Sequence, residues 1–202
     1  MTELLLIAST NPGKLRELRQ ALADLPYRLV TPADLGIRAS VEEIGTTFEE
    51  NAILKATAYA AMGECLALAD DSGLEVDALG GAPGVESARF GGPGLDDAGR
   101  VRLLLEQLAD LPPERRSARF VALIAIADPT GSVVTFRGVC EGIITTMPRG
   151  TGGFGYDPIF QPRGETRTMA ELTLEEKQRL SHRGQAIAAA RAWLSERAKV
   201  GV

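Results

Sequence analysis

The sequence predicts an α/β protein in which helices cover a central sheet. Residues 4–9 form an apolar run with no polar face, which is typical of a strand in a sheet covered on both sides. Residues 47–62 are expected to form a helix, because Thr47 and Glu50 make a capping box ahead of a periodic apolar pattern. Residues 117–128 carry the longest strand pattern of the chain.

The remaining elements follow from apolar spacing and from the turn residues between them. A helix is expected after residue 14, with apolar side chains from Leu15 to Leu25. Ser72 and Gly73 are expected to turn the chain after a short strand at 66–69. Further strands are expected at residues 27–31, 133–139 and 141–146, and further helices at 96–111 and 185–199.

Length and composition bound the type of protein. The 202 residues suffice for one substantial core, or for two lobes that share a sheet. No repeat or linker divides the chain, so we expect a single domain, residues 1–202, made of two lobes. No apolar run approaches the ~20 residues of a membrane span, and the N-terminus lacks the basic start of a signal peptide.

Net charge and cysteine content limit the kinds of binding partner and the cellular compartment that we expect. The net charge of −5 argues against a broad basic surface for nucleic acid, so a polyanionic ligand needs a local cluster of Lys and Arg. The 2 cysteines lack a Cys-x-x-Cys spacing, which fits a reducing compartment. We therefore expect a cytoplasmic protein with no membrane and no nucleic-acid partner.

Two adjacent carboxylates, Asp70 and Asp71, stand where the apolar run of residues 66–69 stops. A loop of small residues follows at 80–84. Carboxylates beside such a loop suit a hard cation such as Mg²⁺, which one or two acids and phosphate oxygens can hold. The alternative is that the two residues only cap a turn.

The segment after the first expected strand is a candidate anion site. Free N–H groups and the helix dipole point into the turn at residues 9–14, where Thr10 and Asn11 add side-chain donors and Lys14 adds a charge. It is not a Walker loop. The alternative is an N-cap followed by a surface lysine.

The helix at 47–62 carries Asn51 and Lys55 on one face, a pair that is usually a solvated stripe. Either Glu42 or Glu43, just before the helix, is placed to give a metal a second carboxylate.

The segment 149–158 is rich in glycine, which lets a chain approach a flat ligand closely. Phe154 and Tyr156 offer ring faces on which a base can stack. The alternative is a loop with two core aromatics.

Near the C-terminus, two capping boxes begin at Thr168 and Thr173. A break between helices at 181–184 is expected to gather Lys177, His182 and Arg183 as donors to carbonyl or phosphate oxygens. A lone histidine at such a place is more often structural.

These segments together resemble the non-standard purine nucleoside triphosphate pyrophosphatases, the inosine/xanthosine triphosphate pyrophosphatase family. The resemblance covers essentially the whole chain in one order. It rests on residues 9–14, 42–52, Lys55, 69–74, 80–84, 87–89, 150–160, 170–177 and 181–184. Ile44 departs from the small polar residue that members often carry before Gly45.

The resemblance implies an elongated three-layer α/β fold with a central mixed sheet, two lobes flanking a nucleotide cleft, and a homodimer. It implies Mg²⁺-dependent hydrolysis of ITP, dITP and XTP to the monophosphate and pyrophosphate, which removes deaminated purines from the nucleotide pool. The two rival readings are a related pyrophosphatase acting on pyrimidine or modified nucleotides and a nucleotide-binding sensor.

The resemblance also implies residue roles. Asp71 is the proton acceptor and, with Glu43, a metal ligand. Together with the charge pattern, this makes Lys14 and Lys55 catalytic candidates, which we expect to stabilise the charge on the departing pyrophosphate. The substrate-binding residues it implies are Ser9, Thr10, Asn11, Lys14, Ser72, Phe154, Gly155, Tyr156, Asp157, Lys177, His182 and Arg183.

Overall fold

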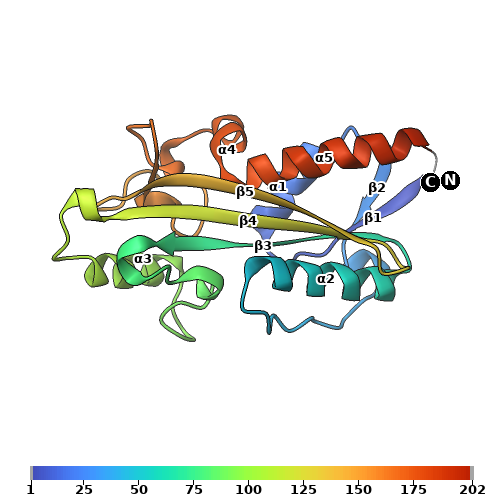
Figure 1. Ribbon diagram of the computed structural model, residues 1–202, viewed down its shortest axis with the longest axis horizontal. Coiled ribbons are helices and arrows are strands. Elements are labelled where there is room, and N and C mark those ends of the chain that lie inside the picture. The colour runs from blue at the N-terminus through green and yellow to red at the C-terminus, as the bar shows by residue number, and fades with distance from the viewer. Residues whose placement is uncertain (1, 201–202) are drawn as a thin grey trace. The chain divides into compact units, whose positions relative to one another are not determined.

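The computed structural model describes residues 2–200 and confirms an α/β fold built on a six-stranded mixed sheet (Figure 1). The strands are β1 (Glu3–Ile7), β2 (Tyr27–Val30), β3 (Leu66–Val76), β4 (Ser117–Ala127), β5 (Val133–Ile144) and β6 (Phe160–Pro162). The helices are α1 (Pro12–Leu22), α2 (Phe48–Gly63), α3 (Asp97–Gln107), α4 (Leu174–Leu180) and α5 (His182–Val200).

The strand order in the sheet is β2-β1-β3-β4-β5-β6. Strand β1 pairs in parallel with both β2 and β3, whereas β5 and β6 are antiparallel. The chain divides into two compact units. The first contains Met1–Asp71, Ala122–Arg137 and Gln185–Val202, and the second contains Ser72–Val121 and Gly138–Gly184. The divisions fall within β3, β4 and β5 and near the start of α5.

In the first unit, helices cover both faces of the sheet. Leu5 and Ile7 of β1 share one buried cluster with side chains of α1 and α5. Helix α2 lies on the other side of the strands in Figure 1, and its Ala52 and Ala56 are fully buried. This double cover is the reason that the β1 segment has no polar face.

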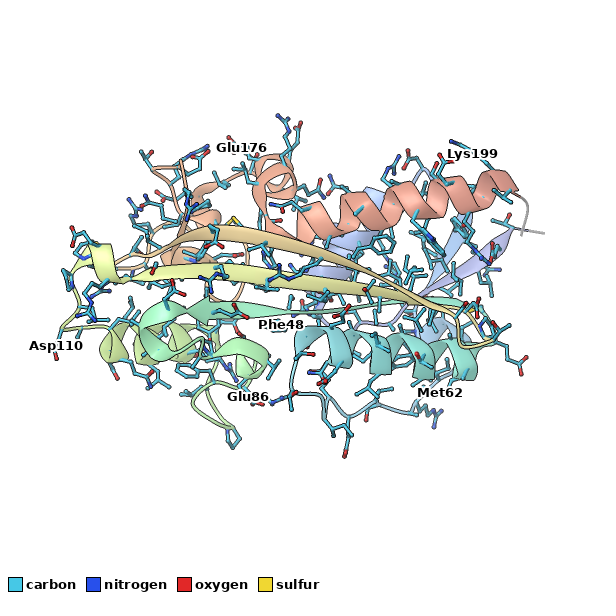
Figure 2. The ribbon with its side chains drawn as sticks, in the orientation of Figure 1. Phe48, Met62, Glu86, Asp110, Glu176 and Lys199 are labelled. Carbon is cyan, nitrogen blue, oxygen red and sulfur yellow. The ribbon has the colours of Figure 1, made fainter. Side chains whose placement is uncertain are left out.

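Helix α2 begins as the sequence predicts. The hydroxyl of Thr47 accepts a hydrogen bond from Glu50 N at 3.1 Å, and the carboxylate of Glu50 accepts from Thr47 N at 3.2 Å. Phe48 and Met62 mark the two ends of this helix in Figure 2. The capping boxes that begin at Thr168 and Thr173 are confirmed as well.

The second unit has its own core. Val101 and Leu104 of helix α3, and Leu108 directly after it, pack with strand residues that include Phe120 and Phe160. The Phe120 and Phe160 rings meet at 4.5 Å between centroids with an interplanar angle of 55°. The loop 149–158 is anchored in this core through Tyr156, which belongs to the cluster.

The structure corrects several expected boundaries. The turn at Ser72 and Gly73 is wrong, because β3 runs without interruption from Leu66 to Val76. The break at 181–184 shrinks to Ser181, whose extended backbone ends α4, and α5 begins at His182. The segments 133–139 and 141–146 form one strand, β5, which ends at Ile144, and α3 ends at Gln107 rather than near residue 111.

Among residues 2–200, no helix combines the length and the apolar character that crossing a membrane requires.

Candidate active site

Lys55 is the centre of a lysine–carboxylate cluster that also contains Lys14, Glu43, Asp70 and Asp71. Its Nζ lies 2.8 Å from Glu43 Oε1, 2.7 Å from the carbonyl oxygen of Asp70 and 3.4 Å from Asp71 Oδ1. The side chain reaches these groups from within α2 and is 10 % exposed. Burial by itself would lower the pKa of Lys55, but the nearby carboxylates, Asp71 foremost, raise that pKa above its ordinary value.

Asp70 anchors the second lysine of this cluster. Lys14 Nζ lies 3.0 Å from Asp70 Oδ1, and Asp70 is 2 % exposed. Lys14 stands in the first turn of α1, where Asn11 Oδ1 caps the helix by accepting hydrogen bonds from Gly13 N at 2.8 Å and Lys14 N at 3.1 Å. The N-cap alternative is therefore correct for Asn11, whereas Lys14 is held in a pair and not free on the surface.

Asp71 keeps acceptor capacity that the described residues do not use. Its Oδ2 is buried, and no group between residues 2 and 200 donates a hydrogen bond to it. Burial raises the pKa of Asp71 above its usual range, and the attraction of Lys55 and Lys14 offsets only part of that effect. A carboxylate with a raised pKa and an unused oxygen is suited to accept a proton.

The donor set fits a hard divalent cation. Glu43 and Asp71 present carboxylate oxygens to the same ammonium group of Lys55, so both lie around one cationic position. Glu42, the other candidate, is exposed. No group of three or more His, Cys, Asp or Glu residues placed to hold a metal occurs in the described part of the chain. Two protein carboxylates suit Mg²⁺, which retains water and phosphate oxygens as its other ligands.

Asn51 fixes the segment that carries Glu43. Its Oδ1 accepts a hydrogen bond from Gly45 N at 2.8 Å, and its Nδ2 donates to the carbonyl oxygen of Gly45 at 3.4 Å. Over the whole residue, Asn51 is 1 % exposed and Lys55 is 8 % exposed, so the interpretation that both side chains face solvent along one side of the helix is wrong. A side chain at position 45 would meet Asn51 Oδ1 at 2.7 Å, which explains the glycine there.

A second group of side chains, the Phe154 cluster, contains Phe154, Asp157, Lys177 and Arg183. Lys177 Nζ lies 4.7 Å and Arg183 Cζ 5.3 Å from the centroid of the Phe154 ring. Both cations are therefore within the range of a cation–π interaction. Asp157 Oδ2 accepts hydrogen bonds from Lys177 Nζ at 2.7 Å and from Phe154 N at 2.9 Å. One buried carboxylate thus orients the ring and one of its two cations.

Arg183 connects this cluster to strand β3. Its Nη2 donates a hydrogen bond to Ser72 Oγ at 2.8 Å. Ser72 follows Asp71 directly in the chain. Burial raises the pKa of Asp157, and the adjacent Lys177 counters only part of that effect.

His182 is held by an aromatic stack. Its ring lies 4.7 Å from the ring of Phe120 with an interplanar angle of 11°, and the residue is 4 % exposed. The stack fixes the plane of the imidazole at the start of α5.

Tyr156 differs from its expected role. Its hydroxyl donates a hydrogen bond to the carbonyl oxygen of Ser87 at 2.9 Å, and the residue is 5 % exposed within the core of the second unit. Burial raises the pKa of this phenol to about 12. The expectation that a base stacks on the Tyr156 ring is wrong, because the core already covers that ring. Phe154 remains as the stacking face.

The structure thus brings part of the predicted residues together in two groups, the lysine–carboxylate cluster and the Phe154 cluster. Ser9 and Thr10 lie in the loop between β1 and α1, next to Lys14 in the chain. Sequence reasoning missed the roles of Asn51, Asp70 and Phe120. The adjacent acids at 70 and 71 gave one usable signal, because two buried carboxylates require two cations.

Known proteins resemble this chain in sequence and in fold. The profile of the Ham1 family matches residues 5–193. The dITP/XTP pyrophosphatase of Anaeromyxobacter sp. (strain Fw109-5) is 48 % identical, covering 98 % of this chain and 99 % of the relative. A dITP/XTP pyrophosphatase of Thermus thermophilus is 52 % identical, covering 91 % of this chain and 87 % of the relative. A HAM1 protein from Coxiella burnetii has a similar structure, with a TM-score of 0.89, 41 % identity and coverage of 96 % of this chain and 99 % of that one.

The Asp71→Asn variant is expected to be more stable than the wild type at neutral pH. Because burial raises the pKa of Asp71 in the folded protein, its ionised form opposes folding. This loss in the free energy of unfolding is absent below about pH 3.9, the pKa of an aspartate in the unfolded chain. It reaches its full size once the pH exceeds the pKa of Asp71 in the folded protein. Urea unfolding between pH 4 and 8 should show the advantage of the variant growing as the pH rises.

Asp77→Asn is the matched control for this measurement. A hydrogen bond from Ser117 lowers the pKa of the exposed Asp77, so neutralising it should slightly reduce stability at neutral pH. A loss of stability at pH 7 in Asp71→Asn would contradict the assigned cost of burying its charge.

Proposed function

The chain belongs to the Ham1 family, and from that premise we propose that it hydrolyses non-standard purine nucleoside triphosphates to the monophosphate and pyrophosphate. The substrates are ITP, dITP and XTP, in line with the dITP/XTP pyrophosphatase names of its relatives. The observation that carries the proposal is the lysine–carboxylate cluster, in which Lys55 lies between Glu43 and Asp71 and Asp71 Oδ2 remains available. In the cell this reaction removes deaminated purines from the nucleotide pool.

The triphosphate is bound at the start of α1. The loop of Ser9, Thr10 and Asn11 presents backbone N–H groups at a helix N-terminus, and Lys14 contributes its charge there. Lys14 and Lys55 neutralise the charge that develops on the departing pyrophosphate.

Glu43 and Asp71 would hold the Mg²⁺ ion. When bound, the ion supplies neutralising charge for the phosphates and helps to orient the attacking water. Both side chains are already directed to one cationic position, that of Lys55 Nζ.

Asp71 acts as the general base. Its carboxylate takes a proton from water while the water oxygen forms a bond to the α-phosphorus. The bond from that phosphorus to the bridging oxygen breaks, and the bridging oxygen leaves with pyrophosphate. The raised pKa of Asp71 strengthens it as a proton acceptor.

The Phe154 cluster recognises the base. Phe154 stacks on the purine, supported by the backbone of Gly155 and by Asp157. Lys177 and Arg183 donate hydrogen bonds to the 6-oxo group, and His182 contacts the purine. Adenine presents an amino donor at that position, so a donor would face a donor, and such a mismatch can reduce kcat/KM by ~10⁴.

Two other functions are weighed against this proposal. A pyrophosphatase for pyrimidine or modified nucleotides would use the same acids but has less need of the Phe154 cluster. A nucleotide-binding sensor has no use for a proton acceptor such as Asp71, whose unused oxygen lies beside two lysines.

We further propose that the protein is a cytoplasmic homodimer, as its resemblance to the family implies. Exposed apolar side chains at Ile44, Leu54 and Met62 would support such an association. Sedimentation velocity should give twice the 21.5 kDa of one chain, and cell fractionation should recover the protein with the soluble cytoplasmic proteins. A mass of one chain at micromolar concentration, or recovery with membranes, would contradict the respective part of this proposal.

A substrate panel tests the proposed reaction. Pyrophosphate release from ITP, dITP, XTP, GTP, ATP and dTTP is measured with Mg²⁺ and with a chelator. We expect Mg²⁺-dependent release from the first three, with the ordinary nucleotides slower by about a hundredfold or more. Preference for dTTP would favour the pyrimidine enzyme, and tight ITP binding without turnover would favour the sensor. Equal rates on ITP and GTP would support the proposed hydrolysis but would refute the proposal that the enzyme discriminates among purine bases.

Asp71→Asn tests the general base. Turnover of ITP should fall by at least a factor of ~10², because the amide cannot take the proton, while ITP binding measured by calorimetry stays within a few-fold. Asp77→Asn, at an exposed position after β3, should keep wild-type turnover. Retention of more than about a tenth of the wild-type rate in Asp71→Asn would rule out its assigned role.

A further inference from the structure

The glycine-rich loop that carries Phe154 needs support from outside itself. Gly150, Gly153 and Gly155 all have positive φ, and glycine loses more conformational freedom on ordering than any other residue. A loop of this composition has no side-chain packing of its own at those positions. The orientation of the Phe154 ring therefore depends on the hydrogen bonds that the loop makes with its surroundings.

Some of these bonds join the loop to itself or to the segment that follows it. Phe154 N donates to Asp157 Oδ2 at 2.9 Å, and Gly152 N donates to the carbonyl oxygen of Ala170 at 2.9 Å. Others come from distant segments of the same unit. The Tyr156 hydroxyl donates to Ser87, and Gly155 N donates to Asp97 Oδ2 at 2.8 Å across 58 positions of sequence.

The side chain of Asp97 can accept a hydrogen bond from the loop because Asp96, and not Asp97, caps helix α3. Asp96 Oδ1 accepts a hydrogen bond from Gly99 N at 2.7 Å and so serves as the N-cap of α3. Asp97 is the first helical residue, with one oxygen 4.0 Å from Arg100 Nη1 and the other on Gly155 N. Its side chain is 61 % exposed, so no packing in the core explains its position.

We propose that Asp97 is a positioning residue for base recognition: it holds Gly155 N, and thereby sets the Phe154 ring for stacking on the purine. The inference rests on the proposed function, since it assigns Asp97 to the base-recognition part of that site. Asp97 lies outside every segment that carries the family resemblance. It acts from the N-terminal end of α3, on the loop residue that follows Phe154.

The experiment compares Asp97→Ala, Asp97→Asn and Glu106→Ala with the wild type. Glu106 is an exposed acid on the same helix and serves as the charge-matched control. In Asp97→Ala we expect KM for ITP to rise about three- to tenfold with kcat within about twofold, the size of effect that loss of one exposed charge-assisted hydrogen bond produces. Asp97→Asn, which retains an acceptor oxygen, should recover most of the affinity, and Glu106→Ala should match the wild type.

A second measurement needs no substrate. Amide hydrogen exchange at Gly155 should be faster in Asp97→Ala than in the wild type or Glu106→Ala, at a temperature where all three are folded. Unchanged exchange, or an unchanged KM, would overturn the role of Asp97. A wild-type protein that does not hydrolyse ITP would refute the proposed function, whereas faster exchange at Gly155 in Asp97→Ala would still establish the tether.

Discussion

The burial of two adjacent carboxylates on β3 is the constraint on which the rest of the site depends. Asp70 and Asp71 are 2 % and 7 % exposed, and an unpaired carboxylate at such depth costs several kcal/mol. Two helices supply the cations. Lys14 reaches Asp70 from the first turn of α1, and Lys55 reaches Asp71 from α2. The positions of both helices in the first unit are thus tied to the chemistry of one dipeptide, because displacing either lysine would leave a charge without its partner.

The lysines offset the charges of the two carboxylates to different degrees, and this difference leaves Asp71 available for chemistry. Asp70 Oδ1 lies 3.0 Å from the Lys14 ammonium, whereas Asp71 Oδ1 lies 3.4 Å from the Lys55 ammonium. The pKa of Asp71 is accordingly raised by burial beyond what Lys55 and Lys14 offset. A fully paired Asp71 would be a poor proton acceptor and a poor ligand. The burial of Asp71 therefore leaves an unfavourable contribution to the free energy of folding. Such perturbed groups are concentrated at functional sites.

Local sequence signals predicted the elements that local interactions determine. The cap of α2 at Thr47 depends on atoms three residues apart, so its pattern is readable in the chain. The prediction of a turn at Ser72 and Gly73 was wrong because β3 continues through these residues. Lys14 and Lys55, which are distant in sequence, pair with the buried Asp70 and Asp71 in this strand. The site followed the same rule. Motifs located Glu43, Lys55 and Asp71, but the contact of Asp97 with Gly155 spans 58 positions and leaves no local pattern.

The chemistry of the Phe154 cluster limits what it can distinguish. Lysine and arginine carry hydrogen-bond donors and no acceptor, so neither can adapt to an amino group by rotating, as an asparagine or glutamine could. Asp157 Oδ2, the nearby acceptor, is already engaged by Lys177 and by Phe154 N. In the proposed base site, the donors of Lys177 and Arg183 would reject the 6-amino group of adenine but would accept any 6-oxo purine, guanine included. Under the proposed function, discrimination between ITP and GTP would then have to arise at the 2-position, through shape or through a guanine amino group left without an acceptor.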